Sequence, residues 1–524
     1  MTHHDIQVII VLLLAVVSLV TLATRINVPF PMTLLIGGMI LALIPGLPRI
    51  ELEPDLVFLL FLPPILFYAA YFTSWRDFKA NLRPIGLLAL GCVTLTTFVV
   101  AWVARMLMPD MPWSVAITLG AIVSPPDAIA ATAIFARLGA PRRVVTILEG
   151  ESLVNDASAL ILYRFGVAAV VGGTFSLLDA SMTFVVLCVG GVALGLACAW
   201  LMDKIVPLIT DSSVAITFTL LAAIGIYVLA EAVHVSGVLA TVAGGIYFGR
   251  HSSRALSSED RVGGKIVWDT VVLAINGLVF ILIGLQLPHL IDAIEGTSMT
   301  TLILQALAIS AVVIVARLVW LFPSAYLPRL LIPGILARDP YPPIGNVILI
   351  GWSGLRGVVS LASALALPLT LDNGQPFPYR DRVIFLTFGV IVVTLLGQGS
   401  LIPFMMRRLR VTDDGSVEKE IKHARALAAK AAIARLDEVQ REEWVPQDHQ
   451  AVLRYRFMHE LQHFREEDHD HAREHHEQTV RLHNEVLQAA RQAVVNARDR
   501  GEIGDEARVR IEQDFDLEQL AKHV

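Results

Sequence analysis

The sequence predicts an all-α integral membrane protein with about thirteen transmembrane helices and a helical tail outside the membrane. Three observations lead to this fold class. Of the 524 residues, 55% are hydrophobic and only 17% are charged, whereas soluble domains carry about 25% charged residues. Apolar runs long enough to cross a hydrocarbon core ~30 Å thick recur from residue 6 to residue 406. Charge is also divided unevenly: residues 411–524 hold 17 Lys and Arg against 25 Asp and Glu, a net −8, so the preceding 410 residues carry +2.

The expected spans follow these apolar runs in order. The first run follows MTHHD, which lacks the basic segment of a cleavable signal peptide, so we expect it to be retained as a span. The thirteen expected spans are 6–24, 30–45, 55–72, 84–106, 113–135, 144–171, 181–205, 214–233, 236–249, 269–288, 300–325, 346–368 and 383–406.

The basic residues of the loops predict the orientation of these spans. If the C-terminus is cytoplasmic, an odd number of spans puts the N-terminus outside. The inside loops then hold 17 Lys and Arg and the outside loops hold 4, in agreement with the positive-inside rule. We therefore expect a multi-pass protein of the plasma (inner) membrane, with a transmembrane domain at 1–410 and a cytoplasmic helical tail at 411–524.

The tail is expected to form amphipathic helices around a polar, histidine-rich middle. Residues 419–439 and 483–503 have the helical pattern of apolar residues. Between them, HDHAREHHE at 469–477 concentrates four histidines. Clustered histidine can sense pH or bind metal, but the spacing forms no closed ligand set, which favours a solvated helix face.

Seven charged side chains fall inside the expected spans, away from the span ends. A charge at the centre of a bilayer costs about 3 kcal/mol, so such residues face a bundle interior or a water-filled cavity and mark ion or proton pathways. Four of the seven are acids on two neighbouring spans, and a cavity lined by acids attracts cations. The seven residues are Asp127, Glu149, Glu151, Asp156, Arg164, Arg317 and Arg356.

The stretch IVSPPDAIAATA predicts a break in the fifth span. Pro125 and Pro126 lack the N–H group that a helix interior needs, and each pushes its preceding residue out of the helical region. We expect two half-helices joined by extended backbone, whose freed carbonyl oxygens can bind an alkali cation. Asp127 would begin the second half-helix, where the helix dipole favours a carboxylate. The alternative is an ordinary proline kink with Asp127 as a simple N-cap.

The sixth span carries EGESLVND, in which polar residues share helix faces. Ser152 and Asp156 are four residues apart, and Glu151 and Asn155 have the same spacing on a neighbouring face. The Asp156 carboxyl group can hold a cation or a proton but not both, and this exclusion is what an exchanger requires. Glu149 is either a vestibule charge at the end of the span or simply solvated.

A second interruption, GWSGLRGVVSLASA at 351–364, places three glycines around Arg356. Paired interruptions in two halves of a chain indicate an inverted-repeat transporter with its site near the bilayer midplane. Because an unpaired buried charge is costly, we expect Arg356 to neutralise an acid, preferably Glu151. Arg317, a possible supporting charge, needs a partner or the C-terminus of a half-helix.

At this point the residues resemble the monovalent cation:proton antiporter family 1, in its bacterial sodium/proton exchanger branch. The family motif T-D-P-x-A corresponds to 126–130, E-G-E-S-x-x-N-D is complete at 149–156, and G-L-R-G is found at 354–357. The motifs occur in order, and the resemblance covers essentially the whole chain. Two positions depart from the family pattern: Pro126 replaces its threonine and Ala128 replaces its proline.

The resemblance implies a site and an assembly. Asp156 would be the principal carboxylate for both ions. Asn155 occupies the position where other branches of the family have a second aspartate, and asparagine at this position is associated with electroneutral exchange. Glu151 and Arg356 would form a structural ion pair, and the protein would be a homodimer with a core that moves against dimerisation helices. The implied Na⁺ and proton site comprises Asp156, Asp127, Asn155, Ser152 and the backbone carbonyl of Pro126, with Na⁺ at the two aspartates.

The sequence therefore predicts a secondary antiporter that exchanges Na⁺, or Li⁺ or K⁺, for protons, with no cofactor and no nucleic-acid partner. One alternative is a K⁺/H⁺ antiporter for pH or osmotic homeostasis, and another is a cation channel that uses the same cavity. An intramembrane enzyme is disfavoured because the spans contain no Ser–His or metal-ligand spacing, and no nucleotide-binding motif is present.

Overall fold

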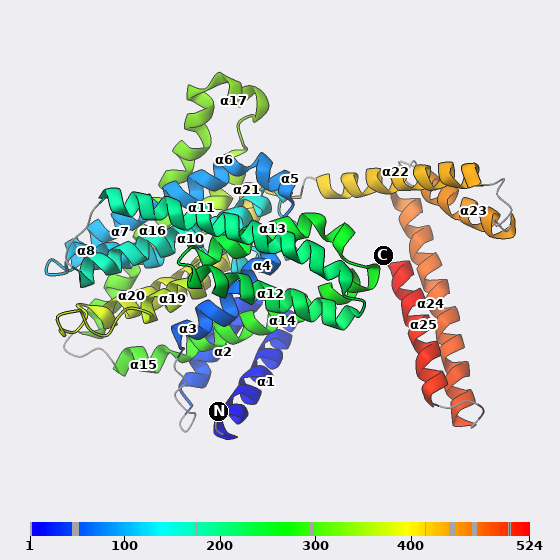
Figure 1. Ribbon diagram of the computed structural model, residues 1–524, viewed down its shortest axis with the longest axis horizontal. Helices are drawn as coiled ribbons and strands as arrows, with labels where there is room; N and C mark the ends of the chain where they lie inside the picture. The colour runs from blue at the N-terminus through cyan, green and yellow to red at the C-terminus, as the bar shows by residue number, and fades with distance from the viewer. Residues whose placement is uncertain are drawn as a thin grey trace. The chain divides into compact units, whose positions relative to one another are not determined.

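The computed structural model describes residues 3–44, 52–172, 177–292, 298–413, 415–439, 447–463, 469–500, 502 and 505–523, and most of these are helical (Figure 1). Over these ranges the only β-structure is one isolated antiparallel bridge between Thr370 and Pro376. The predicted all-α fold is confirmed. Contacts divide the chain into two compact units, Met1–Asp414 and Gly415–Val524.

The first unit consists of consecutive helices, three of them continued through π-helical stretches at Val57–Phe61, Leu87–Cys92 and Val393–Gln398. The α-helices are α1 (His3–Arg25), α2 (Phe30–Ala42), α3 (Pro54–Leu56), α4 (Leu62–Phe72), α5 (Trp75–Ala80), α6 (Leu82–Gly86), α7 (Val93–Leu107), α8 (Trp113–Val123), α9 (Ala128–Leu138), α10 (Arg142–Val171), α11 (Leu177–Ile205), α12 (Ser212–Ala232), α13 (Gly237–Ala255), α14 (Ser258–Leu285), α15 (Leu287–Asp292), α16 (Met299–Leu331), α17 (Pro333–Arg338), α18 (Ile344–Trp352), α19 (Val358–Leu365), α20 (Arg380–Val392) and α21 (Gly399–Leu409).

Each expected span coincides with one helix, with two consecutive helices or with two helices joined by a π-helical stretch. Residue 45, the expected end of the second span, lies outside the described residues. In the described part of the chain, 9 helical segments are long and apolar enough to cross a membrane, and two shorter apolar helices precede them at 10–25 and 30–42. The protein is therefore a multi-pass membrane protein, while the number of thirteen crossings stays a prediction. The 9 segments are Pro54–Phe72, Leu82–Leu107, Trp113–Leu138, Arg142–Val171, Ser181–Leu208, Ser212–Ala232, Ser258–Leu285, Met299–Leu331 and Arg380–Leu409.

One boundary differs clearly from its expected position. The span expected to begin at residue 269 belongs to α14, which already begins at Ser258. Ser257 caps this helix by accepting from the backbone N–H of Asp260, and the Asp260 carboxylate accepts from the N–H of Ser257 in return. Such a capping box starts a helix regardless of hydropathy. The start of the apolar run indicates where the helix enters the lipid, whereas the capping box determines where the helix itself begins.

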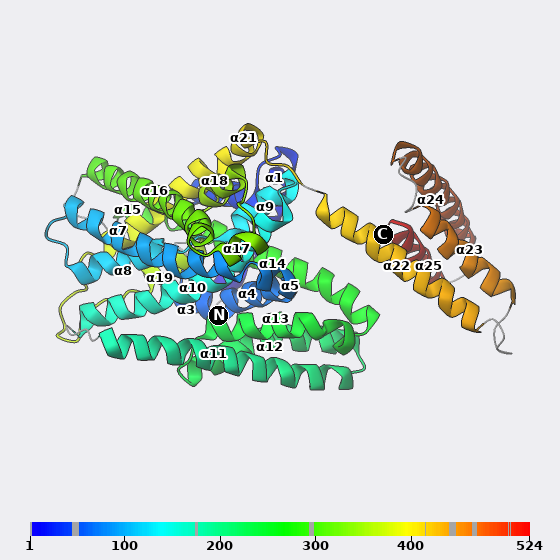
Figure 2. The same cartoon turned by 90° about the horizontal axis from the view of Figure 1, so that it is seen from above.

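The helices of the first unit form two groups that pack mainly among themselves. One group, here called the site bundle, comprises α7, α8, α9, α10, α16, α18, α19 and α20. The other, here called the second bundle, comprises α1, α2, α4, α11, α12, α13 and α14. In Figure 2, α11 and α12 run along one side of the unit, and α7 and α16 run along the other.

Small residues allow the helices within each bundle to approach closely. A Cβ atom on Gly120 of α8 would lie 2.2 Å from the backbone oxygen of Thr97 in α7. In the second bundle, a Cβ atom on Gly195 of α11 would lie 2.0 Å from the backbone oxygen of Ala240 in α13. Because lipid is as apolar as a leucine side chain, such close packing is a main source of helix association in a membrane.

Outside the spans, Asp339 gathers three arginines from separate helices. Its carboxylate accepts from Arg83 at 2.5 Å, from Arg143 at 2.8 Å and from Arg329 at 2.7 Å. Partial burial acts to raise the pKa of Asp339, but the hydrogen bonds from Arg143 and Arg329 outweigh it and hold this pKa below its usual value. The cluster links the segment after α17 to α6, α10 and α16.

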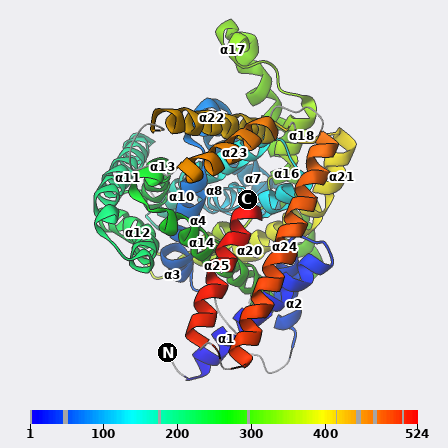
Figure 3. The same ribbon diagram turned by 90° about the vertical axis from the view of Figure 1, so that its right-hand side faces the viewer.

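The second unit, taken by itself, consists of two helix pairs. Helices α22 (Ser416–Val439) and α23 (Gln447–His463) contact each other, as do α24 (His469–Asp499) and α25 (Asp505–His523). Figure 3 shows α24 and α25 side by side, and Arg491 reaches Asp516 between them at 2.5 Å. The side chains of the histidine-rich segment 469–477 lie outside the described residues.

Candidate functional site

The fifth span is broken where the sequence predicts. Helix α8 ends at Val123, residues 124–127 are not helical, and α9 begins at Ala128. Asp127 caps α9 because its Oδ1 accepts from the backbone N–H of Ile129 at 2.8 Å. The hydroxyl oxygen of Ser152 in α10 accepts from the N–H of Ala128 at 3.4 Å. Both oxygens therefore point at the positive end of this half-helix.

The second predicted interruption is also present, and it crosses the first. Helix α18 ends at Trp352 and α19 begins at Val358. Between them, the backbone oxygen of Leu355 accepts from the N–H of Asp127 at 2.6 Å. At Gly357 a Cβ atom would lie 1.8 Å from Oδ2 of Asp127. The Asp127 carboxylate therefore fits between the two breaks only because residue 357 has no side chain.

Arg356 stabilises the crossing through backbone carbonyls. Its side chain is 1% exposed. Its Nε donates to the oxygen of Val123 at 3.0 Å and a terminal nitrogen donates to the oxygen of Ser124 at 3.3 Å, at the C-terminal end of α8. A third hydrogen bond goes to the oxygen of Gly354. The guanidinium thus satisfies the acceptors that the break leaves free, at the negative end of a half-helix.

The predicted ion pair between Glu151 and Arg356 is wrong. Glu151 of α10 instead forms a bidentate pair with Arg317 of α16, in which one Nη–Oε distance is 2.7 Å. Both side chains are essentially inaccessible, at 1% and 0%. Arg317 also donates to the backbone oxygen of Ile350 at 3.2 Å, in the last turn of α18. The carboxylate therefore neutralises Arg317, and freed carbonyls, which have no signal in the sequence, satisfy Arg356.

Asp156 lies on the wall of a cavity of about 740 Å³ between the two bundles. Its side chain is 8% exposed, and it forms no hydrogen bond or ion pair with any residue in the described ranges. Burying a carboxyl group without a partner is costly unless water or an ion occupies the space beside it. On the same wall lie Pro125, Pro126, Asp127, Glu149 and Ser152.

Asn155 takes a different position from the one expected. It is fully buried, at 0% exposure, and is not part of the cavity wall. Its Nδ2 donates to the backbone oxygen of Pro126 at 2.9 Å. Its Oδ1 is buried with no hydrogen-bond partner among the described residues. In this geometry Asn155 orients the carbonyl of Pro126, a residue of the cavity wall.

The facing wall belongs to the second bundle and was missed by sequence reasoning. It contributes Tyr68 of α4 and Asp269 and Asn276 of α14. The Tyr68 hydroxyl donates to Asp269 Oδ1, and Lys265 Nζ lies 2.9 Å from Asp269 Oδ2. A signal was available, because Asp269 and Asn276 are seven residues apart in an apolar run and so share one helix face.

The assembled groups suit a monovalent cation and a proton. Carboxylate, hydroxyl and backbone carbonyl oxygens are hard ligands of the kind that alkali and alkaline-earth ions prefer. Asp156, Asp127, Ser152 and Pro126 bring these three kinds of oxygen to one cavity wall. A carboxylate binds a cation only when deprotonated, so cation and proton exclude each other at such a group.

Comparison with known proteins gives consistent matches. The family model "Sodium/hydrogen exchanger, transmembrane" matches residues 10–408. An uncharacterised Na⁺/H⁺ exchanger of Mycobacterium tuberculosis is 33% identical over 523 residues, which are 98% of this chain and 95% of that protein. A sodium, potassium, lithium and rubidium/H⁺ antiporter of Bacillus pumilus is 33% identical over 78% of this chain and 62% of its own length.

Among solved structures, the sodium proton antiporter MjNhaP1 from Methanocaldococcus jannaschii superposes with a TM-score of 0.62. The match covers 77% of this chain and 98% of that chain, at 18% identity. At this identity the likeness bears on the fold alone.

Proposed function

This chain belongs to the sodium/hydrogen exchanger family, and from that premise we propose that it exchanges cytoplasmic Na⁺ for external protons, with both ions using the Asp156 carboxylate in turn. The resemblance seen in the motifs is thereby confirmed at the level of the family. Exchange of a monovalent cation for protons is the activity of this family of transporters. One observation carries the proposal: Asp156 is nearly buried, lines a cavity, and has no partner in the described part of the protein.

Competition at a single carboxylate explains how the exchange is coupled. When protonated, Asp156 loses the charge that attracts Na⁺, and when Na⁺ is bound the proton is displaced. A return movement with the carboxylate empty would leave an unpaired charge in a low-dielectric interior, which is costly. The site therefore moves between the two sides of the membrane only when Asp156 holds either Na⁺ or a proton. Because one proton replaces one Na⁺, the exchange is electroneutral.

The other predicted site residues take supporting roles in this proposal. Asp127 and Ser152 hold the start of α9 and present oxygen atoms to the cavity. Asn155 keeps the carbonyl of Pro126 in place through its 2.9 Å hydrogen bond. Asn155 is a positioning residue, and its amide adds no titratable group beside Asp156.

The two bundles provide the movement that an antiporter needs. The site bundle carries both broken helices and Asp156, and the second bundle forms the facing cavity wall. We expect the site bundle to move against the second bundle, which would form the homodimer. The cavity extends to Gly139 and Ala140, between α9 and α10, beside the basic residues Arg137, Arg142 and Arg143. By the positive-inside rule this end is cytoplasmic, so the N-terminus would be outside and the tail inside.

Transport of K⁺ or Li⁺ alongside Na⁺ is the second candidate. The Bacillus pumilus relative is named for sodium, potassium, lithium and rubidium. Oxygen ligands bind all of these ions, and selectivity among them depends on cavity size and ligand number. The cation preference is therefore measured by comparing the exchange that each cation drives.

The test uses the purified full chain in proteoliposomes that contain a pH-sensitive dye and an imposed proton gradient. Addition of Na⁺, K⁺ or Li⁺ should dequench the dye in wild-type vesicles. Asp156→Asn should abolish the response to every cation. The matched control is Asp203→Asn in α11, which makes the same chemical change in the second bundle, away from the cavity, and should keep wild-type exchange. Dequenching at the wild-type rate by Asp156→Asn would remove Asp156 from the mechanism. A cation current through the wild-type protein without proton counterflow would indicate a channel.

A further inference from the structure

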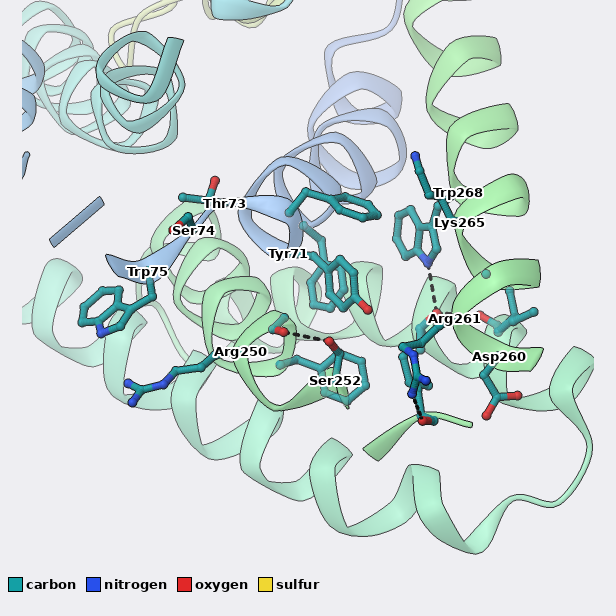
Figure 4. Close-up of a pocket in the computed structure, with 18 of the residues that line it drawn as sticks. Tyr71, Thr73, Ser74, Trp75, Arg250, Ser252, Asp260, Arg261, Lys265 and Trp268 are labelled. Carbon is teal, nitrogen blue, oxygen red and sulfur yellow. Dashed lines mark hydrogen bonds between the residues drawn. The ribbon is translucent and has the colours of Figure 1, made fainter. Parts of the chain in front are cut away.

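A second cavity, of about 620 Å³, lies within the second bundle (Figure 4). It is formed where α4 passes into α5 and where the C-terminal end of α13 meets the N-terminal ends of α12 and α14. It shares only Phe72 with the cavity of Asp156. Nothing in the proposed exchange uses this space.

The walls of the second cavity carry an excess of positive charge. Four basic side chains line it, against a single carboxylate, that of Asp260. Asp260 is already engaged in the capping box with Ser257. The four basic residues are Arg76, Arg250, Arg261 and Lys265. Uncompensated arginines around a concave site attract an anion, and phosphate suits them well.

Two of these arginines have no protein partner in the described ranges. Arg76 and Arg250 are exposed and form no hydrogen bond or ion pair there. Arg261 donates to the backbone oxygen of Leu256 at 2.6 Å, and Lys265 pairs with Asp269 at 2.9 Å. In Figure 4, Arg250 and Arg261 lie on opposite sides of the space around Tyr71 and Ser252, and the Arg250 guanidinium points outward from it. The two arginines without a partner, both exposed, therefore belong to the outer rim of the cavity.

The floor of the cavity is aromatic. Phe67 and Phe248 are each 1% exposed, and the rings of Phe67 and Trp268 stack at 5.7 Å. The Trp268 indole donates to the hydroxyl of Thr219 at 3.1 Å, which fixes the ring. An apolar floor beneath a cationic rim suits an amphipathic anion better than a fully hydrated one.

The surface beside the cavity is apolar and faces outward. Val262 and Ile266 of α14 are adjacent in sequence to Arg261 and Lys265, and they are 65% and 64% exposed. Outward apolar residues next to basic residues at a helix end are typical of the boundary between hydrocarbon and headgroups. A ligand could therefore enter sideways from the bilayer.

We propose that the second cavity binds the phosphate headgroup of an anionic phospholipid, with the arginines on the phosphate and the aromatic floor beneath the first acyl segments. Basic pockets between transmembrane helices bind such headgroups through these interactions. A soluble phosphate would use the same donors, but it would gain nothing from the aromatic floor or the lateral opening.

Lys265 connects this lipid site to the exchange site, a step that depends on the proposed function. Its Nζ binds Asp269, and Asp269 lines the cavity of Asp156. A lipid phosphate competes with Asp269 for Lys265. The Asp269 carboxylate then keeps more of its negative charge toward the cation cavity, so the anionic lipid lowers the KM for Na⁺.

Native mass spectrometry of the full chain tests the binding without any transport. The protein is delipidated in detergent and supplied with phosphatidylglycerol or phosphatidylcholine. The test variant, Arg76→Gln with Arg250→Gln, changes only side chains that have no protein partner in the described ranges, so folding should be preserved. The control, Arg407→Gln with Arg408→Gln in α21, removes the same charge outside the cavity. We expect wild type and control to retain phosphatidylglycerol over phosphatidylcholine, and the test variant to bind it about 30-fold more weakly.

Three results would overturn the lipid assignment. These are equal retention of the two lipids by wild type, equal loss in test and control variants, and displacement of phosphatidylglycerol by soluble glycerol phosphate at matched concentration. The link to exchange is measured separately, as KM for Na⁺ in vesicles with and without phosphatidylglycerol. Wild type should show a lower KM with the anionic lipid, and Lys265→Gln should show no difference between the vesicles. A wild-type KM for Na⁺ that is the same with and without phosphatidylglycerol would refute the link.

Discussion

Replacing Glu151 by Gln is the sharpest test of how the site bundle is held together. The carboxylate accepts two hydrogen bonds from Arg317, and both groups are shielded from solvent. In the variant, Arg317 keeps the backbone oxygen of Ile350 and one neutral amide oxygen as acceptors, but it loses the negative charge that balances its own. Loss of one partner of a buried pair costs about 3–5 kcal/mol because a charge is left uncompensated. We expect the unfolding free energy to fall by that amount.

The measurement is denaturant unfolding of the full chain in detergent, followed by tryptophan fluorescence. Glu149→Gln is the matched control, since this residue lies two positions earlier in α10 and has no partner in the described ranges. Its effect should stay below about 1 kcal/mol. A double-mutant cycle of Glu151→Gln with Arg317→Gln should give a coupling energy of about 2 kcal/mol.

The same cycle between Glu151 and Arg356 should give a clearly smaller coupling energy, because these side chains share no hydrogen bond and interact only through their charges. A strong coupling to Arg356 together with a weak coupling to Arg317 would refute the structural assignment. It would also restore the pairing expected from the sequence.

Two further predictions concern the breaks and the Asp339 cluster. Gly357→Ala would place a Cβ atom 1.8 Å from Asp127 Oδ2, so exchange in proteoliposomes should fall about 100-fold. Gly397→Ala, where the added atom meets nothing within 4 Å, should keep wild-type exchange. Equal exchange rates in the two variants would contradict the tight fit of Asp127 against Gly357. Because the pKa of Asp339 is lowered on folding, its contribution to stability is complete above about pH 4 and is lost as pH falls through the folded-state value. Unfolding free energies at pH 7 and pH 3 should therefore differ less in Asp339→Asn than in wild type, by at most about 1 kcal/mol. An identical pH dependence in the two proteins would show that the cluster is not a net stabiliser.

Much of the fold and part of the site could be predicted because they depend on local chemistry. Proline lacks an N–H group wherever it occurs, so Pro125 and Pro126 break the fifth span in any tertiary setting. An aspartate directly after such a break finds free N–H groups, and Asp127 caps α9 as expected. The length of the apolar runs likewise indicates the helices that cross the membrane.

The pairing of charges could not be predicted in the same way. Glu151 had two candidate arginines, and the choice depended on which helix packs against α10 at that depth. The sequence contains no record of the carbonyls of Val123 and Ser124 turned toward Arg356. The wall that faces Asp156 was missed for a related reason, because Asp269 lines the same cavity from a helix far along the chain.

The sequence by itself determined that this protein spans a membrane, where its helices break and which carboxylates the lipid phase makes costly, because these follow from the covalent properties of single residues and near neighbours. Tertiary structure alone decided that Arg317 neutralises Glu151, that Asn155 holds the carbonyl of Pro126, and that Asp269 lines the same cavity as Asp156. The reason is physical: hydrogen bonds and ion pairs depend on distances of a few ångströms between segments whose approach is determined by the packing of the whole helix bundle.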